Sequence, residues 1–265
     1  MDSYQAAVLA LIQGLTEFLP VSSSGHLLLP SHILGWADQG LAFDVAVHIG
    51  SLCAVVVYFR RDLLRLFSAW CGSLFLRKTS ADAMVAWQLV VATIPAAAAG
   101  WFFADFIEQY MRTLLVIAVT TVVFGLLLGW VDYSRRGDRA LDSLNWSDAI
   151  LIGCSQALAL VPGTSRSGVT ITTALALGYS REAAVRFSFL MAIPIIALSG
   201  LYQGTQLVDS ESVQWVPIAI GVIVSGVSAY VCIDFFLRTV QRLGMMPFVI
   251  YRLLLGIGLF ALSLA

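Results

Sequence analysis

A short run near the start of the chain combines a carboxylate with hydroxyl and imidazole side chains. Gln13 and Glu17 lie four residues apart, so both project from one face of a helix that Pro20 ends. Glu17 falls within an apolar stretch, where a carboxylate is costly and marks a functional site. We expect Glu17 to hold a divalent cation or to act as a base; a hydrogen bond between packed helices is the alternative.

Residues 22–26, with the sequence Ser-Ser-Ser-Gly-His, open the helix that follows. Serine is a favoured N-cap, and the free N–H groups at a helix N-terminus attract anions. Ser23 and His26 are three residues apart, so a hydroxyl and an imidazole can share one face of the first turn, the pairing that activates a nucleophile. The run predicts an anion-binding site in which one serine serves only as a cap.

A second run, residues 162–168 with the sequence Pro-Gly-Thr-Ser-Arg-Ser-Gly, repeats this pattern and carries Arg166 where the first run has Ser23. A guanidinium offers a planar fork of donors that suits phosphate oxygens, and it is strongly unfavourable in lipid without an anion. Arg252 is a second cation within an apolar stretch; snorkelling to a headgroup or pairing with Asp234 is its alternative role. Two cations, two helix N-termini and a carboxylate able to hold Mg²⁺ or Ca²⁺ complement a diphosphate, and the membrane setting suggests a lipid tail.

These residues define a predicted site. Its catalytic residues are Glu17, Ser23, His26 and Arg166, and Glu17 is also the predicted metal ligand. The expected substrate-binding residues are Gln13, Ser22, Ser24, Gly25, Thr164, Ser165, Ser167, Gly168, Thr170 and Arg252. His32 is expected to be structural, and so is His48, as a histidine satisfied inside the helix bundle, with a role as a ligand as its alternative. Arg186 is expected to anchor the chain at the membrane edge.

The composition requires that the elements holding this site be membrane helices. Of the 265 residues, 59% are hydrophobic and 12% are charged, which excludes an ordinary water-soluble fold. A net charge of -1 gives no bulk attraction to nucleic acid, and we expect no nucleic-acid partner. The four cysteines show neither a zinc spacing nor a disulfide framework, and we expect no cleaved signal peptide.

Six apolar stretches are long enough to cross a bilayer: 41–59, 84–104, 113–131, 185–204, 215–237 and 247–264. Two further apolar stretches, 5–34 and 148–178, are each broken by one of the Pro/Ser/Gly runs. Non-helical backbone at membrane depth needs a polar interior, so both are predicted to be re-entrant hairpins around the site. The predicted fold is an all-α polytopic membrane protein with six transmembrane helices and two re-entrant helix–loop–helix hairpins, in a single integral membrane domain over residues 1–265.

The two broken stretches also match each other at a constant offset of 143 residues. Seven identities fall on one ungapped register: Gln13/Gln156, Leu15/Leu158, Ser22/Ser165, Ser24/Ser167, Gly25/Gly168, Leu34/Leu177 and Gly35/Gly178. This pattern indicates an internal repeat, with the first copy over about 1–131 and the second over about 146–265.

The basic residues indicate how the two copies are oriented. In the six-span arrangement, eleven of the fifteen Lys and Arg residues fall on one side, which is then cytoplasmic, and Arg112 alone falls on the other. The first hairpin therefore enters from outside and the second from the cytoplasm, an inverted-topology repeat. Because many transporters share this architecture, a lipid-phosphate transporter or flippase is an alternative function, and an ion-coupled carrier using Glu17 is a weaker one.

The run Gln13-Gly-Leu-Thr-Glu17-Phe-Leu-Pro-Val-Ser-Ser-Ser-Gly-His26 resembles the Glu/Gln-x-x-x-Glu motif and the following Ser-Gly-His segment of the undecaprenyl-diphosphate phosphatases linked to bacitracin resistance. Residues 162–170 resemble the second signature of that family, and residues 186–190 and 247–252 resemble its flanking segments. The resemblance covers essentially the full chain.

This resemblance implies hydrolysis of undecaprenyl diphosphate to undecaprenyl phosphate and inorganic phosphate, which recycles the lipid carrier of peptidoglycan synthesis. It also implies a divalent cation, a bacterial inner-membrane location surrounded by membrane lipids, a site that opens to the periplasm, and bacitracin as a competitor for the substrate. Glu17 would be the key acid, Ser23 the nucleophile, His26 its helper and Arg166 the phosphate clamp. Whether Ser23 forms a covalent intermediate or orients water, and whether the protein is a homodimer, stay open.

Overall fold

The computed structural model describes residues 2–37, 39–135, 137–206 and 215–264. The first half forms six helices: α1 (Ser3–Thr16), α2 (Ser23–Leu34), α3 (Leu41–Tyr58), α4 (Arg60–Phe75), α5 (Ala81–Tyr110) and α6 (Leu114–Ser134). The second half contains α7 (Trp146–Ala157), α8 (Arg166–Ala176), α9 (Arg181–Gln206), α10 (Trp215–Leu243) and α11 (Met246–Leu264), with short 3₁₀ turns η1 (Leu141–Ser143) and η2 (Leu158–Leu160).

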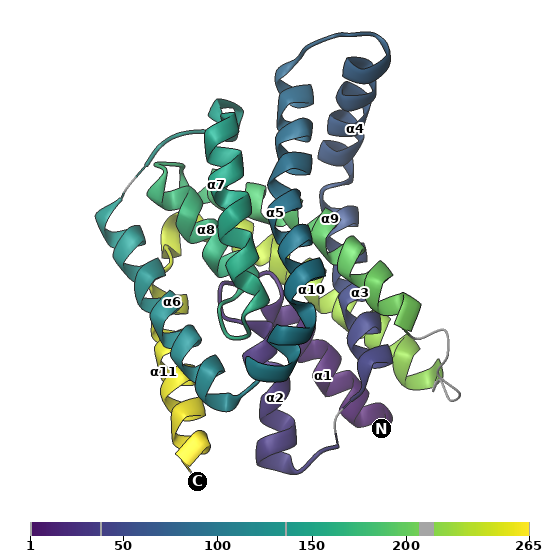
Figure 1. Cartoon of the computed structure of the whole chain (residues 1–265), viewed down its shortest axis with the longest axis vertical. Coiled ribbons are helices and arrows are strands. Elements are labelled where there is room, and N and C mark those ends of the chain that lie inside the picture. Colours follow the sequence, from purple (N-terminus) through teal and green to yellow (C-terminus); the bar gives the residue numbers. More distant parts are fainter. Residues whose placement is uncertain (1, 38, 136, 207–214, 265) are drawn as a thin grey trace.

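Six of these helices are long and apolar enough to cross a bilayer: α3, α5, α6, α9, α10 and α11. They coincide with the six predicted spans, so the predicted all-α membrane fold is confirmed. The helix α4 was not predicted. Its sequence begins with charged residues and has no long apolar run, and it stands beside the start of α5 at one end of the molecule (Figure 1).

The two broken stretches form helix pairs that enter from opposite ends and meet near the middle of the molecule (Figure 1). Hydrogen bonds join their tips: among them, Ser167 Oγ donates to the Leu19 carbonyl (2.8 Å), and the Gly163 N–H donates to Ser24 Oγ (3.2 Å). This arrangement is compatible with two re-entrant hairpins, α1–α2 and α7–α8. It brings together the two runs in which we predicted the site.

The two tips also share an unusual backbone conformation. Ser22 and Ser165, which the 143-residue offset pairs, have φ values of 72° and 68°. Positive φ is uncommon for a residue with a Cβ and costs about 1–3 kcal/mol, so it persists only where the surrounding structure holds it. The equivalent helices α2 and α8 each begin at the residue that follows, which places the side chains of Ser23 and Arg166 at the same point of each turn.

Close helix crossings hold the first tip in place. A Cβ on Gly14 of α1 would overlap the Ser228 hydroxyl and the Ser225 carbonyl of α10, and a Cβ on Gly50 of α3 would overlap the Val222 carbonyl of the same helix. Only glycine allows these backbones to approach so closely. Since Glu17 directly follows α1, the contact between α1 and α10 fixes the position of its carboxylate.

The two hairpins differ in how tightly they pack. Helix α8 is buried on most of its surface and packs on α6, α7 and α9. Helix α2 packs mainly on α1 and α6, and only Gly25, His26 and Pro30 among its residues are buried. One hairpin is therefore embedded in the core, while the other leaves space around its helix.

Ion pairs close the end of the molecule that carries most of the arginines. Arg181 forms a forked pair with Asp132 (2.7 and 3.0 Å), and Arg139 donates to Asp148 (2.7 Å). Arg186, expected to anchor the chain at the membrane edge, pairs with Asp62 at this end (2.9 Å). Burial and the hydrogen bond to Asp148 raise the pKa of Tyr179 well above its ordinary value, so its hydroxyl stays protonated and donates to that carboxylate (2.6 Å).

Candidate active site

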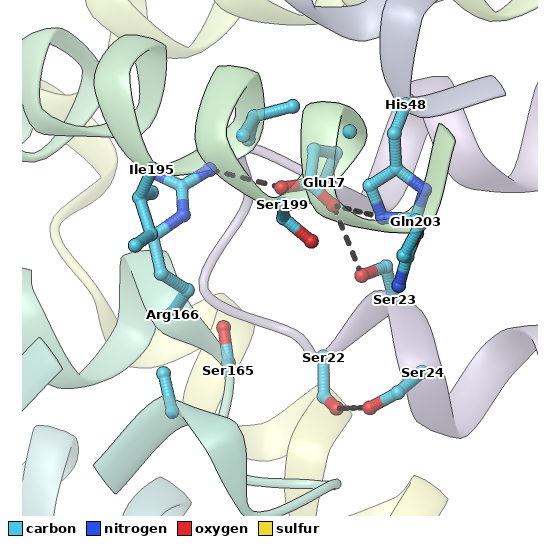
Figure 2. Close-up of a pocket in the computed structure, with 13 residues that line it drawn as sticks. Glu17, Ser22, Ser23, Ser24, His48, Ser165, Arg166, Ile195, Ser199 and Gln203 are labelled. Carbon is cyan, nitrogen blue, oxygen red and sulfur yellow. Dashed lines mark hydrogen bonds and ion pairs between the residues drawn. The ribbon is translucent and has the colours of Figure 1, made fainter. Parts of the chain in front are cut away.

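A cavity of about 240 Å³ lies where the two hairpin tips meet (Figure 2). The first tip contributes Glu17, Ser22, Ser23 and Ser24, and the second contributes Ser165 and Arg166. The remaining lining residues are His48 of α3, Ala159 of η2, and Ile195, Ile196, Ser199, Gly200 and Gln203 of α9. The cavity is therefore polar where the hairpins meet and more apolar along α9.

Glu17 is the centre of the polar network. One carboxylate oxygen, Oε1, accepts a hydrogen bond from Arg166 Nη2 (3.0 Å). The other, Oε2, accepts from Gln13 Nε2 (3.0 Å) and from Ser23 Oγ (3.2 Å). Figure 2 shows Arg166 reaching the carboxylate from one side, with Ser23 and His48 on the other. The sequence-based pairing of Gln13 with Glu17 on one helical face is thus observed.

Arg166 is held by contacts on several sides. Nη1 donates to the Ser188 carbonyl of α9 (3.2 Å), and the guanidinium carbon lies 5.6 Å from the centre of the Phe18 ring. The side chain is 13% exposed and that of Glu17 is 8% exposed, so the ion pair between them is largely withdrawn from water. Two hydrogen bonds leave further N–H donors of the guanidinium for an anion in the cavity.

The serines at the two helix starts behave differently. Ser165 Oγ accepts a hydrogen bond from the Gly168 N–H (3.1 Å) and so caps α8. Ser22 makes no side-chain cap bond to α2; its hydroxyl lies 3.2 Å from that of Ser24. The first N–H groups of α2 are therefore not occupied by a serine cap, which leaves this helix start the better anion-binding end.

His26 does not line the cavity. Nδ1 donates to the Ser22 carbonyl (2.6 Å), and Nε2 lies 2.6 Å from the Tyr251 hydroxyl, whose ring is parallel to the imidazole. Both ring nitrogens are thus occupied, because the carbonyl requires Nδ1 to be the donor and leaves Nε2 to accept from Tyr251. The structure places His26 behind the tip, where it holds the backbone of Ser22.

His48, expected to be structural, is the imidazole that faces the cavity. Nδ1 donates to the Asp44 carbonyl (2.7 Å), and Nε2 lies 3.9 Å from Glu17 Oε2. A backbone carbonyl that fixes one ring nitrogen as the donor orients the other toward the site. The sequence signal was weak: a single histidine in an apolar helix, whose orientation depends on how α3 packs against α10.

Arg252 was expected to contact the substrate; it does not line the cavity. Its side chain is completely buried and donates to four carbonyls: Thr121 (3.1 Å), Pro20 (3.3 Å), Gly163 (2.9 Å) and Thr164 (3.0 Å). The alternative partner Asp234 instead accepts from Arg238 (2.9 Å). Since Pro20 belongs to one tip and Gly163 to the other, Arg252 joins the two tips from behind.

Most other predicted substrate-binding residues support the tips. Ser167 bonds to Leu19 of the first hairpin, Thr170 Oγ1 lies 2.7 Å from the Ser188 hydroxyl of α9, and Gly168 leaves room for Arg252. Gly25 and Thr164 are buried at the two tips and, like these three residues, do not line the cavity. Of the predicted substrate-binding set, the cavity is lined by Ser22, Ser24 and Ser165.

The residues present can share a divalent cation with a substrate. Among the described residues, no group of three or more His, Cys, Asp and Glu side chains is arranged to hold a metal. Glu17 supplies one carboxylate, and the nearby Gln13 Oε1 is buried with no hydrogen-bond partner in the described part of the chain. Mg²⁺ commonly binds one or two carboxylates together with substrate phosphates, so this donor set fits a cation that arrives with the substrate.

Comparison with known proteins gives a consistent result over nearly the whole chain. The family model described as bacitracin resistance protein BacA matches residues 6–258. The undecaprenyl-diphosphatase of Saccharophagus degradans is 55% identical over 262 residues, which cover 99% of this chain and 98% of that protein. The undecaprenyl-diphosphatase of Aliivibrio salmonicida is 54% identical over 262 residues, which cover 98% of each chain.

Proposed function

Because the chain belongs to the BacA family of bacitracin resistance proteins, we propose that the cavity between its hairpin tips is where undecaprenyl diphosphate loses its terminal phosphate. The chain is a multi-pass membrane hydrolase that converts this lipid to undecaprenyl phosphate and inorganic phosphate. The reaction returns the lipid carrier to peptidoglycan synthesis. The observation that carries the proposed location is the contact of Glu17 with both Arg166 and Ser23 in one cavity.

The two tips have different roles in the proposed mechanism. The Arg166 guanidinium and the N–H groups at the start of α2 bind the terminal phosphate and stabilise the charge that its oxygens develop. The Ser23 hydroxyl attacks the phosphorus, and Glu17 Oε2, which already accepts its hydrogen bond, takes the proton. The bond from that phosphorus to the bridging oxygen breaks, and undecaprenyl phosphate leaves. Water then hydrolyses the phosphoserine and releases inorganic phosphate.

The alternative use of Ser23 gives the same products. In that case a water attacks the phosphorus, Ser23 orients it and Glu17 accepts its proton. A divalent cation, Mg²⁺ or Ca²⁺, would be held by Glu17 with the diphosphate and would supply charge neutralisation at the phosphoryl oxygens. The lipid tail needs an apolar exit, and the α9 wall with Ile195, Ile196 and Gly200 offers the apolar side of the cavity.

We propose that the site lies in the bacterial inner membrane and opens to the periplasm. By the positive-inside rule the arginine-rich end is cytoplasmic, so the opposite end, which carries Arg112, faces the periplasm. Bacitracin would compete by binding the same lipid headgroup. A cysteine introduced at Gly137 should react with an impermeant thiol reagent only after the membrane is permeabilised. One at Ser210, which lies outside the described residues, should react from the periplasm. The reverse pattern would invert the orientation.

The decisive experiment measures phosphate release by the purified protein from undecaprenyl diphosphate, with and without a divalent cation. Hydrolysis should place ¹⁸O from labelled water in the inorganic phosphate, and single-turnover samples analysed by mass should reveal a phosphoryl group on Ser23 if the serine attacks. A flippase with the same inverted repeat would leave the lipid unchanged. Failure to release phosphate from a folded protein would refute the proposed chemistry at this cavity.

A further inference from the structure

A second cavity of about 170 Å³ lies on the other side of the serines. Ser23, Ser24 and His48 line both cavities, so they form the wall between them. The other residues of this outer cavity are Leu27, Leu28, Ser31, Gln39, Asp44, Arg112, Ile117 and Pro162. It lies beside α2, the start of α3 and the α5–α6 turn, toward the end where both chain termini lie (Figure 1).

The positions of the second hairpin that match the outer cavity are packed in the described structure. The 143-residue offset pairs Leu27 with Thr170, Leu28 with Ile171 and Ser31 with Ala174. These three partners are 0%, 0% and 1% exposed, so the equivalent volume beside α8 is filled by packed side chains. At the opposite, arginine-rich end, a separate cavity of about 110 Å³ lies beside the Arg181–Asp132 ion pair. Ser23 therefore lines the outer cavity as well as the catalytic one, but it does not line the cavity at the arginine-rich end.

The side chain of Arg112 gives the outer cavity its positive charge. In the sequence it is the one Lys or Arg on this side of the predicted six-span arrangement, where the positive-inside rule disfavours cations. Its ion pair with Glu108 is long (3.5 Å), and the two side chains are 53% and 74% exposed, so the pair contributes little to folding. A cation that departs from the general charge pattern and is only weakly paired suits the binding of an anion.

The acidic groups around Arg112 set the strength of that binding. Asp44 also lines the cavity and accepts a hydrogen bond from Gln39 (3.0 Å), and Glu108 lies next to Arg112. Both carboxylates oppose an anion and partly offset the arginine. Passage through a site requires binding that is favourable enough to admit the ion and weak enough to release it. The outer cavity thus has the charges of a transit site.

We propose that the outer cavity binds a phosphate group at Arg112 on its way between the serines and the outer surface. This inference rests on the function proposed above. It adds a second phosphate-binding position, in the outer cavity, to the one in the catalytic cavity. The phosphate group can belong to the inorganic phosphate that leaves or to the headgroup of the lipid that enters. The two phosphate groups would make the same contact with Arg112. Steady-state kinetics distinguish them, through inhibition by inorganic phosphate and through KM for the lipid.

The first test compares Arg112→Gln with Arg242→Gln, a matched control at an exposed arginine of the opposite end. If leaving phosphate binds at Arg112, the concentration of inorganic phosphate that halves turnover should rise about fivefold, the size of one partly exposed charge contact. If the entering headgroup binds there, KM for undecaprenyl diphosphate should rise by a similar factor instead. Arg242→Gln should change neither. Equal phosphate inhibition and equal KM in the two variants would overturn the proposal.

The second test does not depend on turnover. In a protein whose four native cysteines are replaced by alanine, Ser31→Cys provides a thiol in the outer cavity. Inorganic phosphate or undecaprenyl phosphate should slow its reaction with a small thiol reagent, and adding Arg112→Gln should abolish the protection. If phosphate protects the thiol in a protein that hydrolyses no undecaprenyl diphosphate, the outer phosphate site is supported and the proposed function is refuted. Absence of protection by either ligand would refute the site itself.

Discussion

Replacing Arg252 by methionine should destabilise the fold first and reduce activity as a consequence. The substitution removes donors to four backbone carbonyls while leaving the carbonyls buried. Each buried acceptor left without its partner costs about 1–3 kcal/mol, but the four share one side chain and can relax together. We therefore expect a loss of roughly 3–5 kcal/mol, as for other broken buried charge contacts.

The measurement pairs thermal unfolding in detergent with steady-state kinetics. Arg252→Met should lower Tm by several degrees and lower kcat, because Pro20 and Gly163 of the two tips lose their common donor. Arg252→Lys should recover only part of the loss, since an ammonium has three donors at one point and cannot span carbonyls of three segments. An unchanged Tm together with lost activity would refute this reasoning. Arg252 would then be a substrate-binding residue, as predicted from the sequence.

The remaining predictions concern the cavity. Arg166→Lys should fold and lose at least about a hundredfold in activity, because a point charge cannot reproduce the forked contacts of the guanidinium. A near-normal kcat/KM would show that Arg166 does not bind the phosphate. Ser23→Ala should lower kcat by several orders of magnitude if the serine attacks, and substantial turnover by this variant would rule out the covalent route. Ser22→Ala removes only the contact with the Ser24 hydroxyl, so it should cost about 1 kcal/mol of stability at most. His48→Ala should lower kcat by more than tenfold with little change in Tm. His26→Ala should lower Tm with a smaller change in kcat. If the two variants change kcat equally and Tm equally, neither imidazole has the place described.

The helices and the meeting of the two tips were predictable from local features of the sequence. Pro20 and the run 162–168 break apolar stretches, and a broken stretch at membrane depth needs a polar interior. The shared positive φ of Ser22 and Ser165 agrees with the 143-residue register that pairs them. Helix α4 escaped prediction because it is amphipathic and short, and its sequence lacks the long apolar run by which membrane helices are recognised.

The orientations of individual polar side chains were not predictable in the same way. His48 faces the cavity from α3, which lies close to α10 at Gly50, so its orientation depends on a contact between residues far apart in the chain. Arg252 could not be distinguished from a substrate-binding arginine, since its acceptors come from segments more than 80 residues away. His26 has the spacing of a catalytic partner for Ser23, but Tyr251 of the last helix occupies it.

The matching backbones at the two tips have a consequence for the direction of the site. The residues that begin α2 and α8 occupy matching positions of the two tips but differ in side chain, a serine at residue 23 and an arginine at residue 166. Two serines would lack the clamp, and two arginines would lack the nucleophile and repel each other. The difference at this one pair of positions therefore gives two matching tips a direction, and exchanging the two side chains would reverse the order of the reacting groups along the line that joins the tips.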